Sequence, residues 1–435
     1  MLRTAGDDTI VVGGGLSGLT AAAFLARSGC PVTVLERAAT PGGRAATRES
    51  NGFYLNLGAH ALYRGGHGSR VLDELGVARP GGIPKPSGAY ALDRSVAHAL
   101  PGGFVSLLTT GLFGLAAKLE AGRFLAGLAR IDAAALDRTS VREWIDASMR
   151  HPDVRRFTHA LVRLASYANA PDTMSAGVAV RQLQAALASN VSYLDHGWQT
   201  LVDGVRARAE EAGARLRTAA AVTGVERTSD GRVAGVQLRD GELVAARTVV
   251  VALDAPAAAE VLPDGLARRH AAAATPVLAG CLDVALKSLP RPRATFALGV
   301  DEPVYFSVHS ASARLAPEGG ALIHLGWYVG DDAPEAKTVE RRLEGVLDRL
   351  QPGWRDVIVE RRFLPRMAVV SALATAADGG LSGRPDAAVL ETPGLFLAGD
   401  WVGPDGWLAD SALASGRRAA LRAAEHARRR DVAAA

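Results

Sequence analysis

The chain of 435 residues is poor in the residue types that build disulfide scaffolds, metal clusters and strongly charged surfaces. Its two cysteines, Cys30 and Cys281, form no CxxC pair, which excludes a zinc ribbon and a thioredoxin-like dithiol. Its ten histidines form no HExxH motif, so we expect no metal site. A formal charge of +4 is a weak field for this length, and we expect no binding to nucleic acid.

Long hydrophobic segments are also scarce. Residues 1–9 lack the apolar core of a signal peptide, and nothing in the sequence calls for an oxidising compartment, so we expect a cytoplasmic protein. The stretch Ala99–Ala117 has no charged residue, but it contains Pro101 and four glycines. We expect it to form a helix buried in a domain. A peripheral membrane contact is the alternative.

The strongest pattern is a glycine-rich turn near the beginning of the sequence. Ile10–Val12 is short, β-branched and free of polar residues, as in a buried parallel strand, and GGGLSG follows it directly. The glycines fit the spacing GxGxxG at Gly13, Gly15 and Gly18. The first makes a tight turn, the second lets a pyrophosphate approach the backbone, and the third lets a helix pack on the strand.

The residues around this turn complete a dinucleotide-binding unit. Leu16 and Ser17 lie inside the turn and are binding candidates with its glycines. A helix is predicted over Leu19–Ser28 and ends at Gly29, and its N-terminal N–H groups face the phosphates. Glu36 ends a second strand, where its carboxylate can accept hydrogen bonds from ribose hydroxyls. The same carboxylate repels a phosphorylated ribose, which argues against NADP at this site.

The next segment indicates which dinucleotide is bound. Residues 36–47, ERAATPGGRAAT, resemble the ERxxxxGGRxxT continuation of the amine-oxidase and phytoene-desaturase flavoproteins. The resemblance implies FAD, with Gly42 and Gly43 bringing a loop against the cofactor and Arg44 approaching its pyrophosphate. Glycines permit such a close approach, and arginine binds phosphate as a planar fork. Arg37 belongs to the same motif and is a further cofactor-binding candidate.

The C-terminal part of the chain resembles the same family in two more segments. Gly394–Asp400 resembles the family's LFLAGD strand. This implies that Gly399 and Asp400 hold the ribityl or phosphate part of FAD. Leu408–Ala420 resembles the closing helix of the family, which carries a similar ASGRRAA run.

The start of this closing helix has an electrostatic purpose. Reduction of a flavin can place negative charge on its N1–C2=O edge, and a helix N-terminus stabilises an anion there. The backbone N–H groups of Leu408 and Ala409 are candidates for this contact. Asp410 or Ser411 is expected to cap the helix. Trp407 either faces the flavin or packs in the core.

The middle of the chain supports a discontinuous domain. Residues 198–212 are predicted as a helix and residues 215–244 as four short strands, before a buried strand at Thr248–Ala252. In the resembled family this block belongs to the FAD domain, and the backbone at the position of Val222 touches the adenine. We therefore expect a Rossmann-type α/β FAD-binding domain from residues 1–80, 190–262 and 386–435, and an α+β substrate-binding domain from residues 81–189 and 263–385.

One segment offers a candidate for the reacting centre. Asn56–His60 resembles the strand that passes the isoalloxazine ring in relatives. Gly58 and Ala59 are therefore expected to contact FAD, and His60 is the candidate catalytic residue. The alternative for His60 is a structural histidine bonded to backbone.

Two runs near residues 305 and 323 alternate like paired strands. If they form the floor of a substrate pocket, they bring His309, His324 and Tyr328 to the substrate, with Trp407 as a fourth pocket candidate. The alternative, which the sequence favours for His309, His324 and Tyr328, is that these side chains point into the sheet.

A repeated string bears on the electron acceptor. Residues 379–383 repeat GGLSG, but Pro385 follows closely, and proline breaks the helix that a phosphate site needs. We therefore expect a loop here, no second nucleotide site, and transfer of electrons to O2 or a quinone. Neither cysteine is expected near the flavin ring, which predicts noncovalent FAD.

These features predict an FAD-dependent oxidoreductase. The expected reaction takes a hydride equivalent from an apolar or polycyclic small molecule to flavin N5 and desaturates a C–C bond, since GAHALYR and LADSALASGRRAA look more like desaturase segments. One alternative is a flavin amine oxidase, which predicts an aromatic cage. The other is a non-catalytic lipid carrier of the same fold, as in the Rab GDP-dissociation inhibitors, which predicts no bound flavin. The sequence leaves the oligomeric state open.

Overall fold

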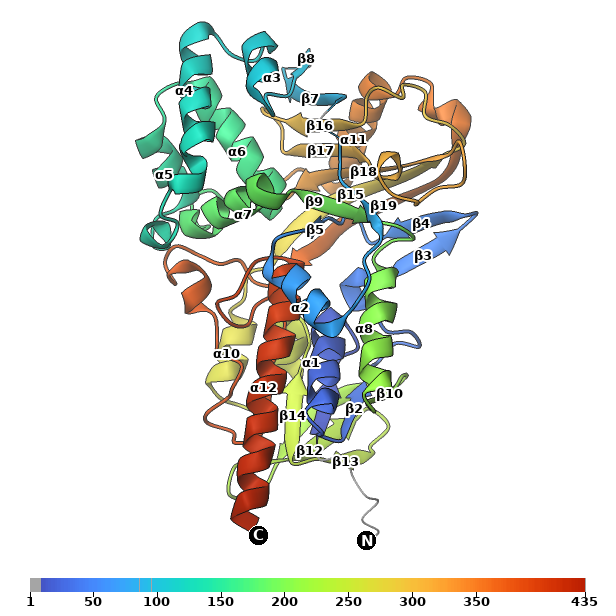
Figure 1. The fold of residues 1–435 in the computed structure, drawn as a ribbon, viewed down its shortest axis with the longest axis vertical. Helices are drawn as coiled ribbons and strands as arrows, with labels where there is room; N and C mark the ends of the chain where they lie inside the picture. The colour runs from blue at the N-terminus through green and yellow to red at the C-terminus, as the bar shows by residue number, and fades with distance from the viewer. Residues whose placement is uncertain (1–8, 86, 95, 435) are drawn as a thin grey trace.

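The computed structural model describes residues 9–85, 87–94 and 96–434. Their elements form two bodies stacked along the long axis of the molecule (Figure 1). Residues 1–8, on which the expectation of a cytoplasmic protein partly rests, lie outside the described residues.

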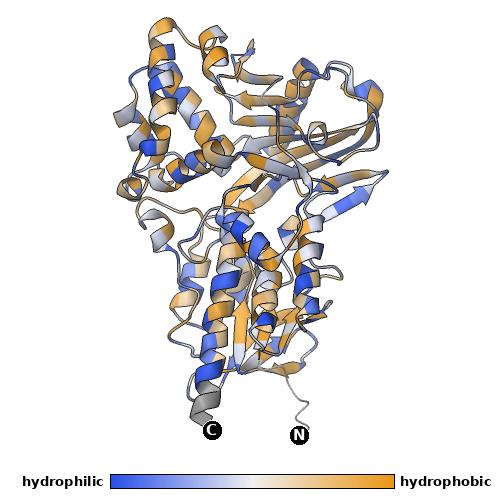
Figure 2. Ribbon diagram, viewed as in Figure 1, coloured by the Kyte–Doolittle hydropathy of each residue, from blue (hydrophilic) through white to orange (hydrophobic). Residues whose placement is uncertain are grey.

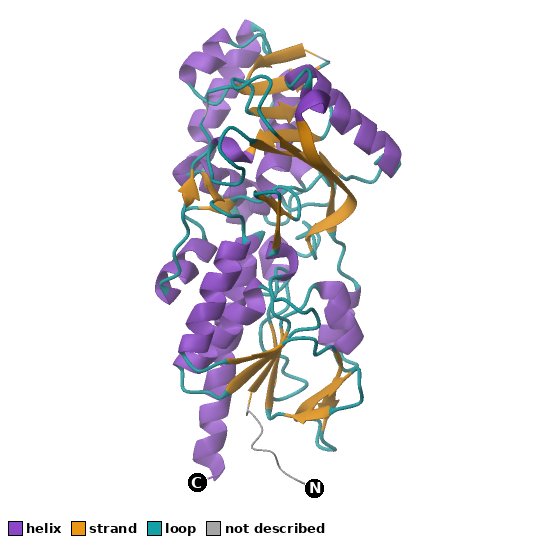
Figure 3. Cartoon of the chain, turned by 90° about the vertical axis from the view of Figure 1, so that its right-hand side faces the viewer, coloured by secondary structure: helices purple, strands orange, loops and turns teal. Residues whose placement is uncertain are grey.

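The lower body is built on a five-stranded parallel sheet with the order β10-β2-β1-β14-β20. Its strands are β1 (Thr9–Val12), β2 (Val32–Leu35), β10 (Arg215–Arg217), β14 (Thr248–Val251) and β20 (Leu395–Leu397). β1 and β14 are β-branched and buried throughout, as a sheet covered on both faces requires. The helices α1 (Leu16–Arg27), α8 (Gln199–Glu211) and α12 (Ala409–Ala434) pack together beside this sheet (Figure 3).

The other side of the parallel sheet carries a small antiparallel sheet (Figure 3). It consists of β11 (Val222–Arg227), β12 (Val233–Leu238) and β13 (Leu243–Ala245), and β12 contacts β14. Strands from three distant parts of the sequence therefore share one body, which confirms the predicted Rossmann-type fold. α12 continues beyond Ala420, where the closing helix was predicted to end.

The upper body is built on a seven-stranded sheet with the order β19-β15-β18-β17-β16-β7-β8. Its strands are β7 (Ala89–Asp93), β8 (Val96–Ala99), β15 (Val277–Leu286), β16 (Phe296–Gly299), β17 (Val304–Val308), β18 (Ala321–Tyr328) and β19 (Ile358–Val370). The helices α5 (Val141–Ser148), α6 (Pro152–Ser166) and α7 (Ala176–Ser189) form a layer beside it, and α11 (Ala336–Leu350) packs on β15 (Figure 1). The predicted pairing of two strands is confirmed, since Ser307 lies opposite His324.

Short elements complete the two bodies. They are β3 (Thr47–Ser50), β4 (Phe53–Asn56), β5 (Leu62–Tyr63), β6 (Gly81–Gly82), β9 (Val191–Leu194), α2 (His67–Leu75), α9 (Ala255–Val261) and α10 (Leu266–Ala272). Ala267 and Ala271 of α10 lie in the core of the lower body, beyond the boundary predicted at residue 262. The repeated GGLSG string forms a short 3₁₀ helix, Gly380–Gly383, where a loop was predicted.

The uncharged stretch 99–117 does not form one buried helix, so that prediction is wrong. It contains α3 (Phe104–Thr109) and the start of α4 (Leu115–Gly127), with Gly111 and Gly114 in the break between them. Phe104 is 77% exposed and Leu115 is 78% exposed. Figure 2 shows both helices as largely apolar ribbon at the top of the upper body. Among the described residues, no helix is long and apolar enough to cross a membrane.

The N-terminus of α2 is capped from a distant part of the chain. The buried carboxylate of Asp410 accepts a hydrogen bond from the backbone N–H of Gly68 at 2.9 Å and another from that of His67. A Cβ on Gly66 would stand 1.8 Å from this carboxylate, so the contact requires glycine there. Asp410 therefore caps α2, and the prediction that it caps its own helix is wrong. Burial raises the pKa of Asp410 to about 6 despite these bonds.

This raised pKa predicts a loss of stability as pH rises. Between about pH 4 and pH 6 the unfolded chain releases the proton of Asp410 while the folded chain keeps it, so ionisation costs on the order of 2–3 kcal/mol of unfolding free energy above pH 6. The variant Asp410→Asn is expected to flatten this part of the curve in urea unfolding measured from pH 4 to pH 7. The control Asp264→Asn, at an exposed carboxylate, is expected to keep the wild-type slope. An unchanged slope in Asp410→Asn would contradict the assignment.

Candidate active site

A cavity lies between the two bodies, at the carboxyl ends of the parallel strands. Gly13 after β1, Glu36 after β2, Ala252 after β14 and Gly399 after β20 all line it. Open α/β sheets bind their ligands at this edge. The predicted cofactor residues that line the cavity are Gly13, Gly15, Leu16, Ser17, Glu36, Arg37, Gly42, Gly43, Arg44, Ala59, Val222, Gly399, Asp400, Leu408 and Ala409, whereas Gly18 and Gly58 pack behind it.

The glycine turn leaves room for a ligand on its cavity side. Gly13 has a φ of +107°, which favours glycine. A Cβ on Gly18 would stand 1.9 Å from the carbonyl oxygen of Gly13, so only glycine lets α1 pack this closely on the turn. A Cβ on Gly15 would meet nothing nearer than the oxygen of Gly42, at 4.0 Å. Gly15 is the N-cap of α1 and offers no side chain to the first N–H groups of the helix, which leaves them for an anion.

The carboxylate of Glu36 is held by two backbone amides. Oε2 accepts from the N–H of Gly14 at 2.6 Å, and Oε1 accepts from that of Ala38 at 2.8 Å. Glu36 therefore closes the glycine turn as well as lining the cavity, a role that its spacing in the sequence did not reveal. Each oxygen retains a second lone pair for a ribose hydroxyl.

An ion pair between Arg44 and Asp400 joins the two ends of the chain at the cavity wall. Nη1 of Arg44 lies 2.7 Å from Oδ2 of Asp400 and 3.1 Å from the carbonyl oxygen of Val369. Asp400 is 2% exposed and also accepts from the backbone N–H and the hydroxyl of Ser371. Burial alone would raise the pKa of Asp400, but the charge of Arg44 and the bonds from Ser371 outweigh it and hold the pKa below its usual value.

The first turn of α12 also lines the cavity. Leu408, Ala409 and Ala412 border it, so the N–H groups and positive dipole end of the helix lie at the wall. Leu408 has a φ of +57°, a left-handed conformation that is rare for a branched side chain. The prediction that Ser411 caps this helix is wrong, because its hydroxyl lies 3.0 Å from the carbonyl oxygen of Leu408 and 3.1 Å from that of Asp400.

His60 lines the cavity, but backbone carbonyls occupy both of its ring nitrogens. Nδ1 lies 3.1 Å from the oxygen of Gly58, and Nε2 lies 3.1 Å from that of Arg44. Burial lowers the pKa of His60 below its usual value, so the ring is neutral and donates to one carbonyl at a time. Its edge packs on Trp198. This geometry favours the structural alternative for His60.

The four predicted pocket residues lie away from the cavity wall. His309 stands 2.9 Å from the hydroxyl of Tyr305, and Nδ1 of His324 stands 2.6 Å from Asp283. Trp407 donates from its indole N–H to the carbonyl oxygen of Ser166 at 2.9 Å, and Arg384 covers its ring. Tyr328 is 1% exposed, and its hydroxyl has no hydrogen-bond partner among the described residues. His309, His324, Tyr328 and Trp407 are buried in the upper body and none lines the cavity.

Cys281 lies closer to the expected flavin segment than the sequence suggested. Its Sγ stands 2.9 Å from the position a Cβ on Gly58 would take, and it receives a hydrogen bond from the backbone of Ala59. Burial raises the pKa of this thiol to about 12, so it stays protonated and is a poor nucleophile. Cys281 does not line the cavity, which agrees with a noncovalent cofactor.

Sequence reasoning missed several residues of the cavity wall. Asp254 follows β14, and the edge rule for parallel sheets could have found it. Met367 and Val369 come from β19, and Tyr167 comes from the end of α6. No motif marks these three, because only the packing of the upper body brings them to the site.

The open glycine turn and Arg44 make the cavity suitable for a dinucleotide. Known sequences similar to this chain indicate its family. A sequence model of the flavin-containing amine oxidoreductases matches residues 16–424. The chain belongs to this family. Over 293 residues it is 29% identical to phytoene dehydrogenase of Streptomyces griseus, covering 59% of this chain and 56% of that protein.

Other proteins that the chain is similar to carry different names. (S)-6-hydroxynicotine oxidase of Paenarthrobacter nicotinovorans is 29% identical over 263 residues, which cover 56% of this chain and 59% of that protein. The chain thus aligns with less than two thirds of the length of either relative. Cyclohexylamine oxidase from Brevibacterium oxydans has a TM-score of 0.74 at 17% identity, covering 97% of this chain and 100% of that one, which shows the shared fold.

A flavin cofactor follows from membership of this family, and the cavity fits FAD. The open side of Gly15 and the uncapped start of α1 would hold its pyrophosphate, Glu36 its ribose, and the first turn of α12 its ring. The bound cofactor would supply two-electron acceptance, which no side chain can provide. The chain's own part is to bind, orient and shield that cofactor.

Two alanine substitutions in the glycine turn separate folding from cofactor binding. Gly18→Ala forces backbone to move and is expected to lower the free energy of unfolding by about 2–4 kcal/mol. Gly15→Ala projects into open space, so unfolding of the apo-protein should change by less than about 1 kcal/mol. Its methyl group occupies the phosphate side, and FAD binding measured by titration should weaken at least about tenfold. Wild-type FAD affinity in Gly15→Ala would contradict the site.

Proposed function

We propose that this protein is an FAD-dependent oxidoreductase that removes a hydride equivalent from an apolar small molecule and desaturates a C–C bond. The substrate would lose a hydride and a proton, and O2 or a quinone would finally take up the two electrons. The observation that carries the proposal is the uncharged character of the cavity wall supplied by the upper body.

That wall consists of small and apolar side chains with few neutral polar groups. Ala59, Met367 and Val369 contribute to it, and Leu408 adds an apolar side chain from the start of α12. Burial raises the pKa of Tyr167 well above its usual value, so its phenol stays neutral. In the described part of the chain no lysine lines the cavity. Such a wall favours a neutral carbon skeleton over a charged one next to the flavin.

His60 is proposed to act by position rather than by proton transfer. Its ring stands between the backbone carbonyls of Gly58 and Arg44 and donates to one of them, so it fixes the spacing of these two segments. A proton relay would need a ring nitrogen free to face the substrate.

A flavin amine oxidase is the second candidate. The 29% identity to (S)-6-hydroxynicotine oxidase equals that to phytoene dehydrogenase, so the alignments give no preference. An amine oxidase is expected to have an aromatic cage, and the aromatic residues in the described cavity wall are Tyr167 and Trp198. Since Trp198 packs on His60, this wall supports the amine alternative less well than the desaturase.

The absorbance spectrum of the purified protein, recorded before and after denaturation, tests the cofactor and then the reaction. We expect the visible bands of a flavin, released as free FAD on unfolding. Under anaerobic conditions a cyclic terpene should bleach the long-wavelength band, and an amine of the same ring size should not. Bleaching by the amine alone would replace the desaturase with the amine oxidase. A colourless protein that takes up no added FAD would favour the lipid carrier.

The apolar face of α3 and α4 supports a peripheral membrane contact through which an apolar substrate could reach the site. Phe104, Val105, Leu108, Leu115 and Leu119 are all more than half exposed on this face. Lys118 lies among them and suits an anionic lipid surface.

Sedimentation with anionic lipid vesicles tests this contact. The double variant Phe104→Ser, Leu115→Ser removes two of the most exposed apolar side chains and should reduce the bound fraction several-fold. Leu243→Ser, at an exposed leucine on β13, is the control and should bind like the wild type. Equal binding of all three proteins would contradict a contact through α3 and α4.

A further inference from the structure

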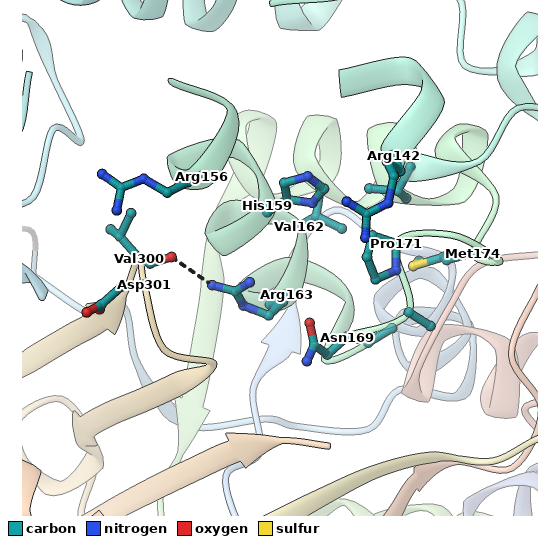
Figure 4. A pocket seen from close by; sticks show the side chains of 13 residues that line it. Arg142, Arg156, His159, Val162, Arg163, Asn169, Pro171, Met174, Val300 and Asp301 are labelled. Atoms are coloured by element: carbon teal, nitrogen blue, oxygen red, sulfur yellow. Dashed lines mark hydrogen bonds between the residues drawn. The ribbon is translucent and has the colours of Figure 1, made fainter. Parts of the chain in front are cut away.

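A second pocket lies in the upper body, between α5, α6 and two loops (Figure 4). Arg142 comes from α5, and Arg156, His159 and Arg163 come from α6. The segment Ala168–Pro171 forms another side. Figure 4 shows Arg163 between the carbonyl oxygen of Val300 and the side chain of Asn169. The wall between the charged groups is apolar, through Val141, Val162, Met174 and Val300.

The cations of this pocket differ in whether they have a counter-ion. Arg142 pairs with Asp172 through two hydrogen bonds. Arg156 lies 2.9 Å from Asp93 and 2.8 Å from Asp153. Arg163 forms no ion pair with any described residue, although it is the most enclosed of the three.

The donors of Arg163 are only partly used. Its Nη2 donates to the carbonyl oxygen of Gly299 at 3.1 Å and approaches that of Val300 at 3.4 Å. Its Nε is buried and has no partner among the described residues. Asp301 lies close enough to act electrostatically on Arg163 but forms no ion pair with it, and its two oxygens accept from the backbone N–H groups of Arg94, at 2.8 Å, and Glu302, at 2.9 Å.

The electrostatics of the pocket favour the binding of an anion. Burial lowers the pKa of Arg163 to about 10, so it keeps its charge at neutral pH but at a cost in free energy. Burial and two neighbouring arginines lower the pKa of His159 to about 4, so this ring stays neutral. A ligand with negative charge would compensate Arg163 and use its free N–H groups.

The pocket and the flavin cavity share a wall. Tyr167 lines the cavity, and the next residues of the chain, Ala168 and Asn169, line the pocket. Behind Tyr167 stands Tyr328, with ring centroids 5.9 Å apart, and Asn169 donates to the carbonyl oxygen of Tyr328 at 3.3 Å. The unpartnered hydroxyl of Tyr328 is an electrostatic neighbour of Arg163. The pair Tyr167 and Tyr328 thus connects the neighbourhood of Arg163 with the cavity wall.

We propose that this pocket binds the carboxylate of the substrate, with Arg163 as its counter-ion, while the apolar body of the substrate passes Tyr167 into the flavin cavity. The planar fork of an arginine matches a carboxylate, and the apolar side chains around it suit the adjoining carbons. The inference rests on the proposed function and narrows its substrate class to apolar molecules that carry one carboxylate.

Straight-chain carboxylates of increasing length are the probes. Acetate, hexanoate and decanoate, with decanol as the uncharged control, are titrated into the FAD-loaded protein by calorimetry, and the flavin absorbance is followed in parallel. We expect decanoate to bind more tightly than acetate or decanol. We also expect only the longer carboxylates to shift the flavin bands, because only their tails reach past Tyr167.

Three variants test the role of Arg163. Arg163→Met should weaken decanoate binding at least about tenfold, since it removes the charge and the free donors. Arg163→Lys keeps the charge without the fork and should bind with intermediate affinity. Arg155→Met is the matched control, because Arg155 lies on the same helix, pairs with Asp146 and does not line the pocket. It should bind decanoate like the wild type.

Two results would overturn the proposal. One is decanoate binding that is equal in the wild type and in both Arg163 variants. The other is binding that depends on Arg163 but leaves the flavin bands unchanged at every chain length, since the pocket would then lie off the path of the substrate. Calorimetry detects the anion without a flavin, so a protein that binds decanoate through Arg163 but takes up no FAD would contradict the proposed function and not the anion site.

Discussion

The ion pair between Arg44 and Asp400 is the contact on which the site depends. A buried carboxylate is costly unless a cation and hydrogen-bond donors compensate it. Arg44 and Ser371 provide both, and Arg44 also binds the carbonyl oxygen of Val369. Segments from the beginning, the end and the upper body of the chain therefore meet at one point.

This meeting point fixes the polar half of the cavity. Arg44 follows the Gly42–Gly43 loop, whose backbone bridges to Gly15 at the start of α1. Asp400 lies shortly after β20, in the loop that leads to α12. The N-termini of α1 and α12 and the guanidinium of Arg44 thus border a single space, which is an arrangement for a dinucleotide. The upper body contributes the neutral half, where an organic substrate would lie.

The sequence predicted the lower body well because its signals are local. Short β-branched strands, a glycine turn with fixed spacing and an acid at the end of β2 each follow from nearby residues. It predicted contacts between distant residues poorly in both bodies, because no local pattern encodes them. The position of Asp410 at the start of α12 suggests that it caps its own helix. Because Gly66 has no side chain, the carboxylate of Asp410 can instead reach the start of α2 and cap that helix.

Other errors have the same origin. The composition of residues 99–117 indicated burial, but glycines break the helix and leave its apolar side chains on the surface. Alternation placed His324 on a paired strand correctly, whereas His309 lies in the 3₁₀ helix that follows β17, and the pattern could not tell which face of the sheet meets the cavity. The unpaired charge of Arg163 also depends on where Asp93, Asp153 and Asp172 come to lie, which no pattern encodes.

The affinity for FAD in a double-mutant cycle tests the central contact most directly. Arg44→Gln and Asp400→Asn are made singly and together, with Arg48→Gln as control, because Arg48 forms an exposed ion pair with Glu360. The account predicts that each single variant binds FAD at least about tenfold more weakly, and that the double variant is little worse than either single one, because both remove one interaction. Wild-type affinity in both single variants, or fully additive losses, would contradict the claim that this pair holds the site together.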